Sequence, residues 1–346
     1  IENLSAREPG GLVVIYDLAY VFFENCIIRN IFSEADGGLI FMMDYTSTHV
    51  RHRHEYQSYS DEEGKYILTM SVTDCYISNV SSGAEGGLIR SDLYSNLRFS
   101  YNTVENVRAE GNGGVLHITT EDLYFFNFQG NSFRGCSSGG SGGVVQINTH
   151  PYMEREADGY PTNPAISDST FNAITKGNSY INCKAYLSGG VWSINYGVIW
   201  AFEFSDEMYI DNQAGSSGGA IALLSSGISQ FHINNSTFMN NQALGIHFDA
   251  SLKGDGGAIY VHDEMSGFKL VNTEMKVPYS IMNYENSGLK KAANPSGHAW
   301  TFPHNGDVMR LMPKGSYGEI TSQDMFDYSG GNFYRGKNDY YRYFFD

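Results

Sequence analysis

The sequence predicts an all-β protein, a right-handed parallel β-helix of about eight to nine coils, and repeated features predict it. A Gly-Gly pair followed at once by an apolar run occurs eight times, beginning at Gly10, Gly37, Gly86, Gly113, Gly142, Gly189, Gly218 and Gly256. The steps between these pairs are 27, 49, 27, 29, 47, 29 and 38 residues, so the basic repeat is near 28 residues. This period is typical of a solenoid, in which each unit buries its apolar face by stacking on its neighbours.

The residues that follow each Gly-Gly pair alternate as a β-strand does. The second residue after the pair is always large and apolar, and the fourth is apolar in every repeat except the one with Ser91. The third residue is unrestricted and includes Arg90, His117 and Gln146. One face of this strand therefore points inward. The pair itself marks a corner that needs a positive φ or a close approach to the next coil.

Each repeat also holds a second strand-like segment, which ends in an aromatic or aliphatic residue, two spacers and Asn or Cys. SYINC (179–183) and STFMNNQ (236–242) are examples. Three short strands per turn, separated by Gly, Asn and Ser corners, account for one repeat, and the general rule for parallel crossovers gives the right-handed sense. Because one coil alone buries too little apolar surface to fold, we expect backbone ladders and stacked Asn side chains to join the coils.

This pattern divides the chain into a repeat region, residues 1–267, and a C-terminal region, residues 268–346. Two long steps in the repeat hold polar insertions near residues 45–66 and 149–165. We expect them to be loops that project from a corner of the helix. They are either solvated insertions or binding loops, since loops on a rigid scaffold often carry function.

The four cysteines fall at equivalent places in consecutive coils. Cys26 and Cys75 each lie 11 residues before a Gly-Gly pair, and Cys136 and Cys183 each lie 6 residues before one. Equivalent residues of adjacent coils are about 4.8 Å apart, within the Cα range of a disulfide. The sequence predicts the bridges Cys26–Cys75 and Cys136–Cys183; the alternative is a ladder of free thiols.

Composition and sequons favour an exported protein. The chain has 346 residues, 17% of them charged, and a formal charge of −16, which argues against nucleic-acid binding. It has no apolar run long enough for a membrane span. It begins with Ile, from which we expect a processed chain, a fragment or a sequence without its signal peptide. Four N-glycosylation candidates agree with an extracellular location: Asn3, Asn79, Asn234 and Asn235.

The repeat resembles the passenger domains of chlamydial polymorphic outer membrane proteins and related repeat proteins of protist surfaces. GGAI at 218–221 and 256–259, with FMNN at 238–241 and YIDN at 209–212, carries this resemblance, which covers about residues 10–265. It implies an exported β-helix that acts in adhesion or as a surface structure. The chain departs from the family in having no autotransporter barrel and in replacing several FxxN residues.

The two ends predict contacts with other subunits. Only nine residues precede the first Gly-Gly pair, so the N-terminal edge is expected to be bare. Open edges pair with other chains, so either the chain continues upstream or another subunit covers this edge. The last fourteen residues are crowded with aromatic side chains, which we name as assembly candidates: Phe333, Tyr334, Tyr340, Tyr341, Tyr343, Phe344 and Phe345. They form either a cap on the chain's own last coil or an arm that docks on the next subunit.

No catalytic constellation is present in the sequence, and no cofactor or metal site is expected. The acidic runs at 61–63 and 154–158 lie in the insertions, where solvated charge is the simpler interpretation. His49, His52 and His54 in HVRHRH lack partnering cysteines, so we expect no metal there.

The sequence therefore predicts an extracellular structural protein rather than an enzyme. We expect it to self-associate, end to end, in a surface filament or coat. The alternatives are a surface adhesin that binds glycan or protein through its insertions, and a polysaccharide lyase or hydrolase.

Overall fold

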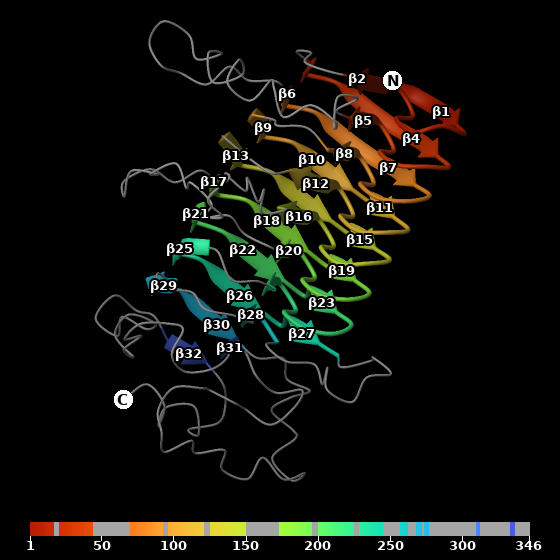
Figure 1. Ribbon diagram of the computed structural model, residues 1–346. Helices are drawn as coiled ribbons and strands as arrows, with labels where there is room; N and C mark the ends of the chain where they lie inside the picture. The colour runs from red at the N-terminus through yellow and green to blue at the C-terminus, as the bar shows by residue number, and fades with distance from the viewer. Residues whose placement is uncertain are drawn as a thin grey trace, which may run out of the picture.

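The computed structural model describes residues 1–16, 21–43, 70–92, 96–120, 125–149, 173–195, 200–224, 228–244, 257–261, 268–271, 273–276, 309–311 and 333–335. Throughout these residues the regular structure is β-strand, without a helix, and all paired strands are parallel. The strands stack from the first coil, red in Figure 1, to the last, blue. The predicted all-β parallel β-helix is confirmed.

Three sheets form the sides of the stack, and we call them sheets A, B and C. Sheet A contains β1 (Glu2–Ala6), β4 (Ile27–Ser33), β7 (Tyr76–Ser82), β10 (Thr103–Glu105), β11 (Arg108–Ala109), β14 (Ser132–Arg134), β15 (Ser137–Ser138), β18 (Ser179–Ile181), β19 (Lys184–Ala185), β22 (Met208–Ile210), β23 (Gln213–Ala214), β26 (Thr237–Met239), β27 (Gln242–Ala243), β30 (Glu274–Lys276) and β32 (Phe333–Arg335). Sheet B contains β2 (Val13–Tyr16), β5 (Ile40–Met43), β8 (Ile89–Ser91), β12 (Leu116–Thr120), β16 (Val145–Thr149), β20 (Trp192–Asn195), β24 (Ile221–Leu223), β28 (Ile259–Val261) and β31 (Met309–Leu311). Sheet C contains β3 (Val21–Glu24), β6 (Met70–Thr73), β9 (Asn96–Ser100), β13 (Phe125–Gln129), β17 (Ala173–Lys176), β21 (Trp200–Ser205), β25 (Ile228–Asn234) and β29 (Phe268–Val271).

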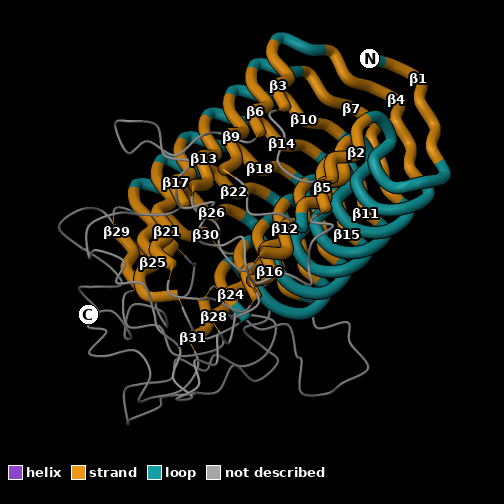
Figure 2. Tube along the Cα trace, turned by 45° about the horizontal axis from the view of Figure 1, so that its top comes forward, coloured by secondary structure: helices purple, strands orange, loops and turns teal. Residues whose placement is uncertain are grey.

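Each coil passes through the sheets in the order C, A, B, as the tube in Figure 2 shows. The Gly-Gly pair turns the chain from sheet A into sheet B. Both long insertions leave the stack after a sheet B strand, β5 or β16, and return at sheet C. Beyond residue 267, the strands β29, β30, β31 and β32 add further rungs to the three sheets.

The two glycines of each pair are required for different reasons. The first has a positive φ, +66° at Gly113 for example, which side chains of L-residues rarely tolerate. The second lies against the next coil, because a Cβ on Gly114 would overlap the carbonyl oxygen of Gly143. The sequence predicted either a positive φ or a close approach to the next coil at each Gly-Gly pair, and the structure shows both.

Aromatic rings stack along the inside of the helix. The ring centroids of Phe133, Tyr180, Tyr209 and Phe238 follow one another at 5.2, 4.9 and 4.5 Å. In sheet C, Thr175 lies between Phe128 and Phe204 in the same column, and its small side chain leaves room for an aromatic ring from another sheet. Trp192 fills this room, with its ring edge-on to Phe128 at 5.4 Å and to Phe204 at 5.2 Å. A small residue in one sheet is thus compensated by a large one in another.

A buried column of polar residues runs along the corner where sheet A begins, and we call it the corner column. Each Asn side chain in it accepts and donates hydrogen bonds along the stack: Asn102 Nδ2 donates to Asn131 Oδ1 at 3.1 Å, and Asn131 Nδ2 to Asn178 Oδ1 at 2.9 Å. Each also donates to a backbone carbonyl of the preceding coil, as Asn178 Nδ2 does to Phe128 O at 2.8 Å. The predicted Asn ladder is confirmed, and it satisfies corner groups that would otherwise be buried without partners.

Glu207 occupies the next place in this column. Its side chain is 2% exposed, and its Oε1 accepts from Asn178 Nδ2 at 2.8 Å. Its Oε2 has no hydrogen-bond partner, although the hydroxyls of Thr175 and Tyr180 lie beside the carboxyl. Burial raises the pKa of Glu207 to about 8. An amide at this place would be a donor, and a carboxyl can donate only when it is protonated.

We predict that mutation distinguishes the two roles of glycine, the close backbone contact and the positive φ, by their different costs in unfolding free energy. Gly114→Ala places a methyl group in a backbone contact and should cost more than about 3 kcal/mol of unfolding free energy. Gly177→Ala is the matched control, because Gly177 has a φ of +67° but no atom within 4 Å of an added Cβ, so only the left-handed strain of about 1 to 2 kcal/mol applies. Urea unfolding measures both; equal losses would contradict the assignment.

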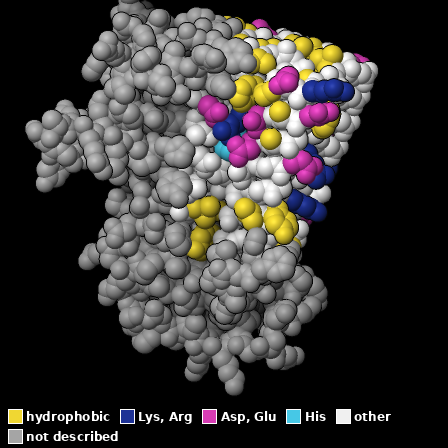
Figure 3. Space-filling model, turned by 45° about the vertical axis from the view of Figure 1, so that its right-hand side comes forward, with side chains coloured by type: hydrophobic (Ala, Val, Ile, Leu, Met, Phe, Trp, Pro, Cys, Tyr) yellow, Lys and Arg dark blue, Asp and Glu magenta, His cyan; other side chains and the backbone are white. Residues whose placement is uncertain are grey.

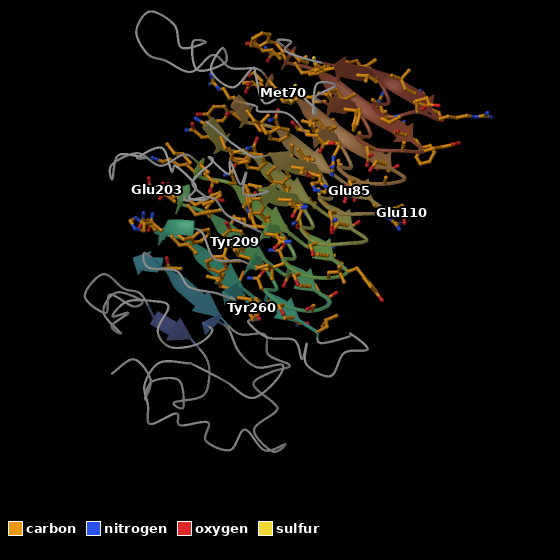
Figure 4. All side chains as sticks on the ribbon, viewed as in Figure 1. Met70, Glu85, Glu110, Glu203, Tyr209 and Tyr260 are labelled. Atoms are coloured by element: carbon orange, nitrogen blue, oxygen red, sulfur yellow. The ribbon has the colours of Figure 1, made fainter. Side chains whose placement is uncertain are left out.

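We predict that Glu207→Gln stabilises the fold at high pH. The folded-state pKa of about 8 lies above the ordinary 4.5, so the folded chain holds this proton more tightly than the unfolded chain. The contribution of Glu207 to stability is therefore fully present below about pH 4.5 and falls as the pH rises to about 8, by roughly 1.4 kcal/mol per pH unit. Thermal unfolding across this range should show Glu207→Gln gaining over the native chain as the pH rises. Glu203→Gln, on the outer side of sheet C, is the control (Figure 4). A gain that is independent of pH would show that Glu207 is already ionised.

Candidate functional site

The first coil carries large apolar side chains on its outer surface. Phe22 is 63% exposed, Ile27 56% and Phe32 43%. Val14, on sheet B, is also exposed. These residues lie on β2, β3 and β4, which together make one turn through sheets B, C and A, and we call them the apolar collar; β1 lies beside β4 at the N-terminal end of sheet A.

The strand register shows which residues occupy the outward places of Phe22, Ile27 and Phe32 in later coils. Phe22 is followed along its column by Ser71, Arg98 and Asn127. Ile27 is followed by Tyr76, Thr103 and Ser132, and Phe32 by Ser81, Arg108 and Ser137. The outward places of Phe22, Ile27 and Phe32 thus become mostly polar in later coils, whereas Val14 is followed by Phe41 and Phe32 is preceded by Ser5. Exposed apolar side chains grouped in this way are the kind of surface that another chain covers.

The sequence contains a signal for the collar, but the alignment of repeats on their Gly-Gly pairs does not display it. The strand after each pair includes only Val14 of the four collar residues. Aligning the sheet A and sheet C segments in the same way places Phe22, Ile27 and Phe32 opposite Ser, Thr and Arg. That contrast is the signal.

The cysteines lie in the predicted coil-to-coil pairs but are free thiols in the structure. Tyr76 N donates to Cys26 O at 2.9 Å, and Lys184 N donates to Cys136 O at 2.9 Å, so each pair occupies adjacent rungs. The predicted bridges are therefore not present in this structure. The thiols stand in places that Asn fills in later coils, and they act as weak donors there, as Cys75 Sγ does to Thr73 O at 3.2 Å.

The two pairs differ in access to solvent. Cys26 is half-buried, whereas Cys136 and Cys183 are fully buried. Burial raises the pKa of the Cys75 thiol and raises that of Cys183 well above its ordinary value. Reagents in solution therefore reach the first pair through Cys26.

Three of the four glycosylation candidates are exposed: Asn3, Asn79 and Asn235. All three have a positive φ; Asn3 and Asn79 lie within β1 and β7, and Asn235 lies between β25 and β26. Asn30 joins two of them, because its Nδ2 donates to Asn3 Oδ1 at 3.0 Å and its Oδ1 accepts from Asn79 Nδ2 at 3.3 Å. Asn234 is half-buried, and the serine of its sequon, Ser236, is buried.

Other predicted residues fall partly or wholly outside the described part of the chain. Phe333 and Tyr334 lie in β32, which pairs with β30. The remaining aromatic residues of the tail, 340–345, and the insertions at 45–66 and 150–165, with their histidines and acidic runs, lie outside the described residues. Within the described ranges there is no group of three or more metal-ligating side chains placed to hold a metal ion. Those same ranges contain no helix that could span a membrane.

Comparison of the chain with protein-family models, with curated proteins and with solved structures finds no match. A function is therefore inferred from the geometry of the chain itself.

Proposed function

We propose that this protein is an extracellular structural β-helix that assembles end to end into a surface filament or coat. The observation that carries the proposal is the apolar collar, which gives the first coil a surface suited to burial. Three side chains of this size, fully covered, contribute about 1.5 to 3 kcal/mol each. An assembly contact repeated at every subunit junction needs no more than such a local patch and an edge for backbone pairing.

The occupant of the collar that we propose is the aromatic C-terminal segment of a second copy, residues 333–346. Seven of its fourteen residues are Phe or Tyr. Charge favours the same match, because residues 1–36 contain six acidic and two basic residues, whereas the segment contains three basic and two acidic ones. A head-to-tail contact between two different surfaces produces an open filament.

The cysteine pairs support the extracellular part of the proposal. Each pair stacks adjacent coils on either side of a long insertion, where an oxidising compartment would join them. A bridge across a loop of nearly 50 residues contributes about 4 kcal/mol in the chain-entropy model.

We predict that exchanging the collar for the residues of later coils prevents assembly. In the triple variant Phe22→Ser, Ile27→Thr and Phe32→Ser, each new residue already occurs further along the same column, so the fold should be retained. Sedimentation velocity and electron microscopy at rising concentration should show rods for the native chain and monomers for the variant.

The matched control is Met208→Thr. Met208 is 40% exposed and stands in the Ile27 column, but in a later coil, and Thr237 follows it. This variant should assemble as the native chain does. If the native chain stays monomeric at every concentration, end-to-end assembly is excluded. If the triple variant forms rods, the collar is not the assembly surface.

We predict that glutathione disulfide oxidises Cys26–Cys75 before Cys136–Cys183. Each bridge takes two thiols and one glutathione disulfide and releases two molecules of glutathione, with the oxidised pair becoming the disulfide. Peptide mapping without reductant should find the first bridge early, because Cys26 is accessible, and the second only after folding is coupled to oxidation. Four free thiols after refolding in the oxidant would contradict both bridges.

A further inference from the structure

The outer side of sheet B carries a polar face that spans four coils and is independent of the collar. It consists of three rows, which run along the stack and which we call the corner row, the middle row and the outer row. The corner row contains Glu85, Asn112, Ser141 and Ser188; the middle row Arg90, His117, Gln146 and Ser193; the outer row Asp92, Thr119, Asn148 and Asn195. Along the middle row's column the first two coils have Val14 and Phe41, and later coils have Ala222 and Tyr260, so the polar face is bounded at both ends.

The outer row is half-exposed, and buried residues of the middle row hold several of its side chains in place. Arg90 Nη2 pairs with Asp92 Oδ1 at 2.7 Å. Gln146 Nε2 donates to Asn148 Oδ1 at 2.7 Å. His117 Nε2 lies 3.1 Å from Asn148 Nδ2 and 3.3 Å from Thr119 Oγ1. Surface side chains are usually free to rotate, whereas these are fixed from below, as the polar groups of a binding site are.

Charge at the face is mixed. Arg90 contacts Glu85 and lies beside His117, whose Nδ1 is 3.0 Å from Glu85 Oε2. Burial lowers the pKa of His117; the hydrogen bond to Glu85 opposes this, and the nearby Arg90 charge adds to it. Burial opposes ionisation of Glu85, but the hydrogen bond and charge of His117, the charge of Arg90 and the hydrogen bond from Asn112 outweigh it and lower the pKa of Glu85 to about 2. Figure 3 shows basic, acidic and His side chains gathered together in this way on the surface.

Three polar atoms of the middle row have no hydrogen-bond partner: Arg90 Nε, Gln146 Oε1 and Ser193 Oγ. Gln146 is only 3% exposed, yet its carbonyl oxygen is unsatisfied while its amide nitrogen holds Asn148 in the outer row. Leaving such an atom unpaired costs about 1 to 3 kcal/mol. These atoms are enclosed beneath the surface, so Gln146 can affect a ligand only through Asn148, the half-exposed side chain that it holds in place.

We propose that this face binds a neutral oligosaccharide laid along the outer row. The row presents a carboxylate, a hydroxyl and two carboxamides, the groups that pair with sugar hydroxyls. Its side chains repeat with the strand spacing of about 4.8 Å, whereas an extended peptide advances about 3.3 Å per residue and would pair with a sheet edge instead. A hexose unit in an extended glycan is similar in length to one coil step. The carboxylates of Glu85 and Asp92, together with the chain's formal charge of −16, disfavour an anionic glycan.

The test is a glycan array of short neutral and acidic oligosaccharides, followed by calorimetric titration of the full chain with the best ligand. Asn148→Ala should lower the affinity at least about tenfold. Gln146→Leu should also weaken binding, because Asn148 is no longer held in place, yet raise the melting temperature, because it removes a buried carbonyl oxygen that has no hydrogen-bond partner. A residue with a merely structural role would not move these two readouts in opposite directions. Gln129→Ala, half-exposed on sheet C, is the control and should bind as the native chain does.

Several results would overturn the proposal. These are no binding of any neutral oligosaccharide, binding of acidic glycans alone, or native affinity in Asn148→Ala. Loss of binding on deletion of residues 45–66 together with native affinity in Asn148→Ala would place the ligand on the insertion rather than on the sheet.

Discussion

Each coil can lie directly on the next only because the second glycine of every Gly-Gly pair has no side chain. Gly87, Gly114 and Gly143 each bring their backbone against the carbonyl oxygen of the corresponding glycine in the following coil. This contact fixes the vertical alignment of the stack at the corner between sheets A and B. Since strand register on both sides follows from that alignment, one position without a Cβ determines which residues form columns through the whole molecule.

Once the columns are fixed, the chemistry of each residue depends on what lies above and below it. The corner column passes through Cys26, Cys75, Asn102, Asn131 and Asn178 before it reaches Glu207. A carboxyl in that place has the same neighbours as an amide would have. It can accept a hydrogen bond from the preceding Asn as an amide does, but it can donate one only when it is protonated. The raised pKa of Glu207 is therefore a property of the column more than of the residue. Exposed apolar residues are also interpreted from their columns. Phe22 is informative because the polar residues Ser71 and Arg98 follow it in the same column.

The sequence predicted the β-helix, its three strands per coil and the Asn ladder because these depend on spacing, and spacing is visible in one dimension. It did not predict that Glu207 is buried, since a single acidic residue after SD in a strand-rich segment is typical of a surface charge. The polar face of sheet B was also missed. The third residue after each Gly-Gly pair is never an acid, whereas Glu85 precedes the pair and Asp92 follows the strand. These residues meet only when the corner and the strand end are folded onto one surface, as the ion pairs of Arg90 with both of them show.

The two candidate surfaces lie on different parts of the stack, and this arrangement suits a protein whose subunits are joined in a row. The collar surrounds one turn near the N-terminus, whereas the polar face, which includes Glu85, occupies the side of coils further along (Figure 4). Joining subunits through their ends would leave their sides open. A weak ligand site repeated at each subunit then gains avidity from the filament, because the second contact is made at a high effective concentration. End-to-end assembly and a lateral sugar site are therefore compatible in one molecule, and each can be removed by mutation without disturbing the glycine contacts on which the stack depends.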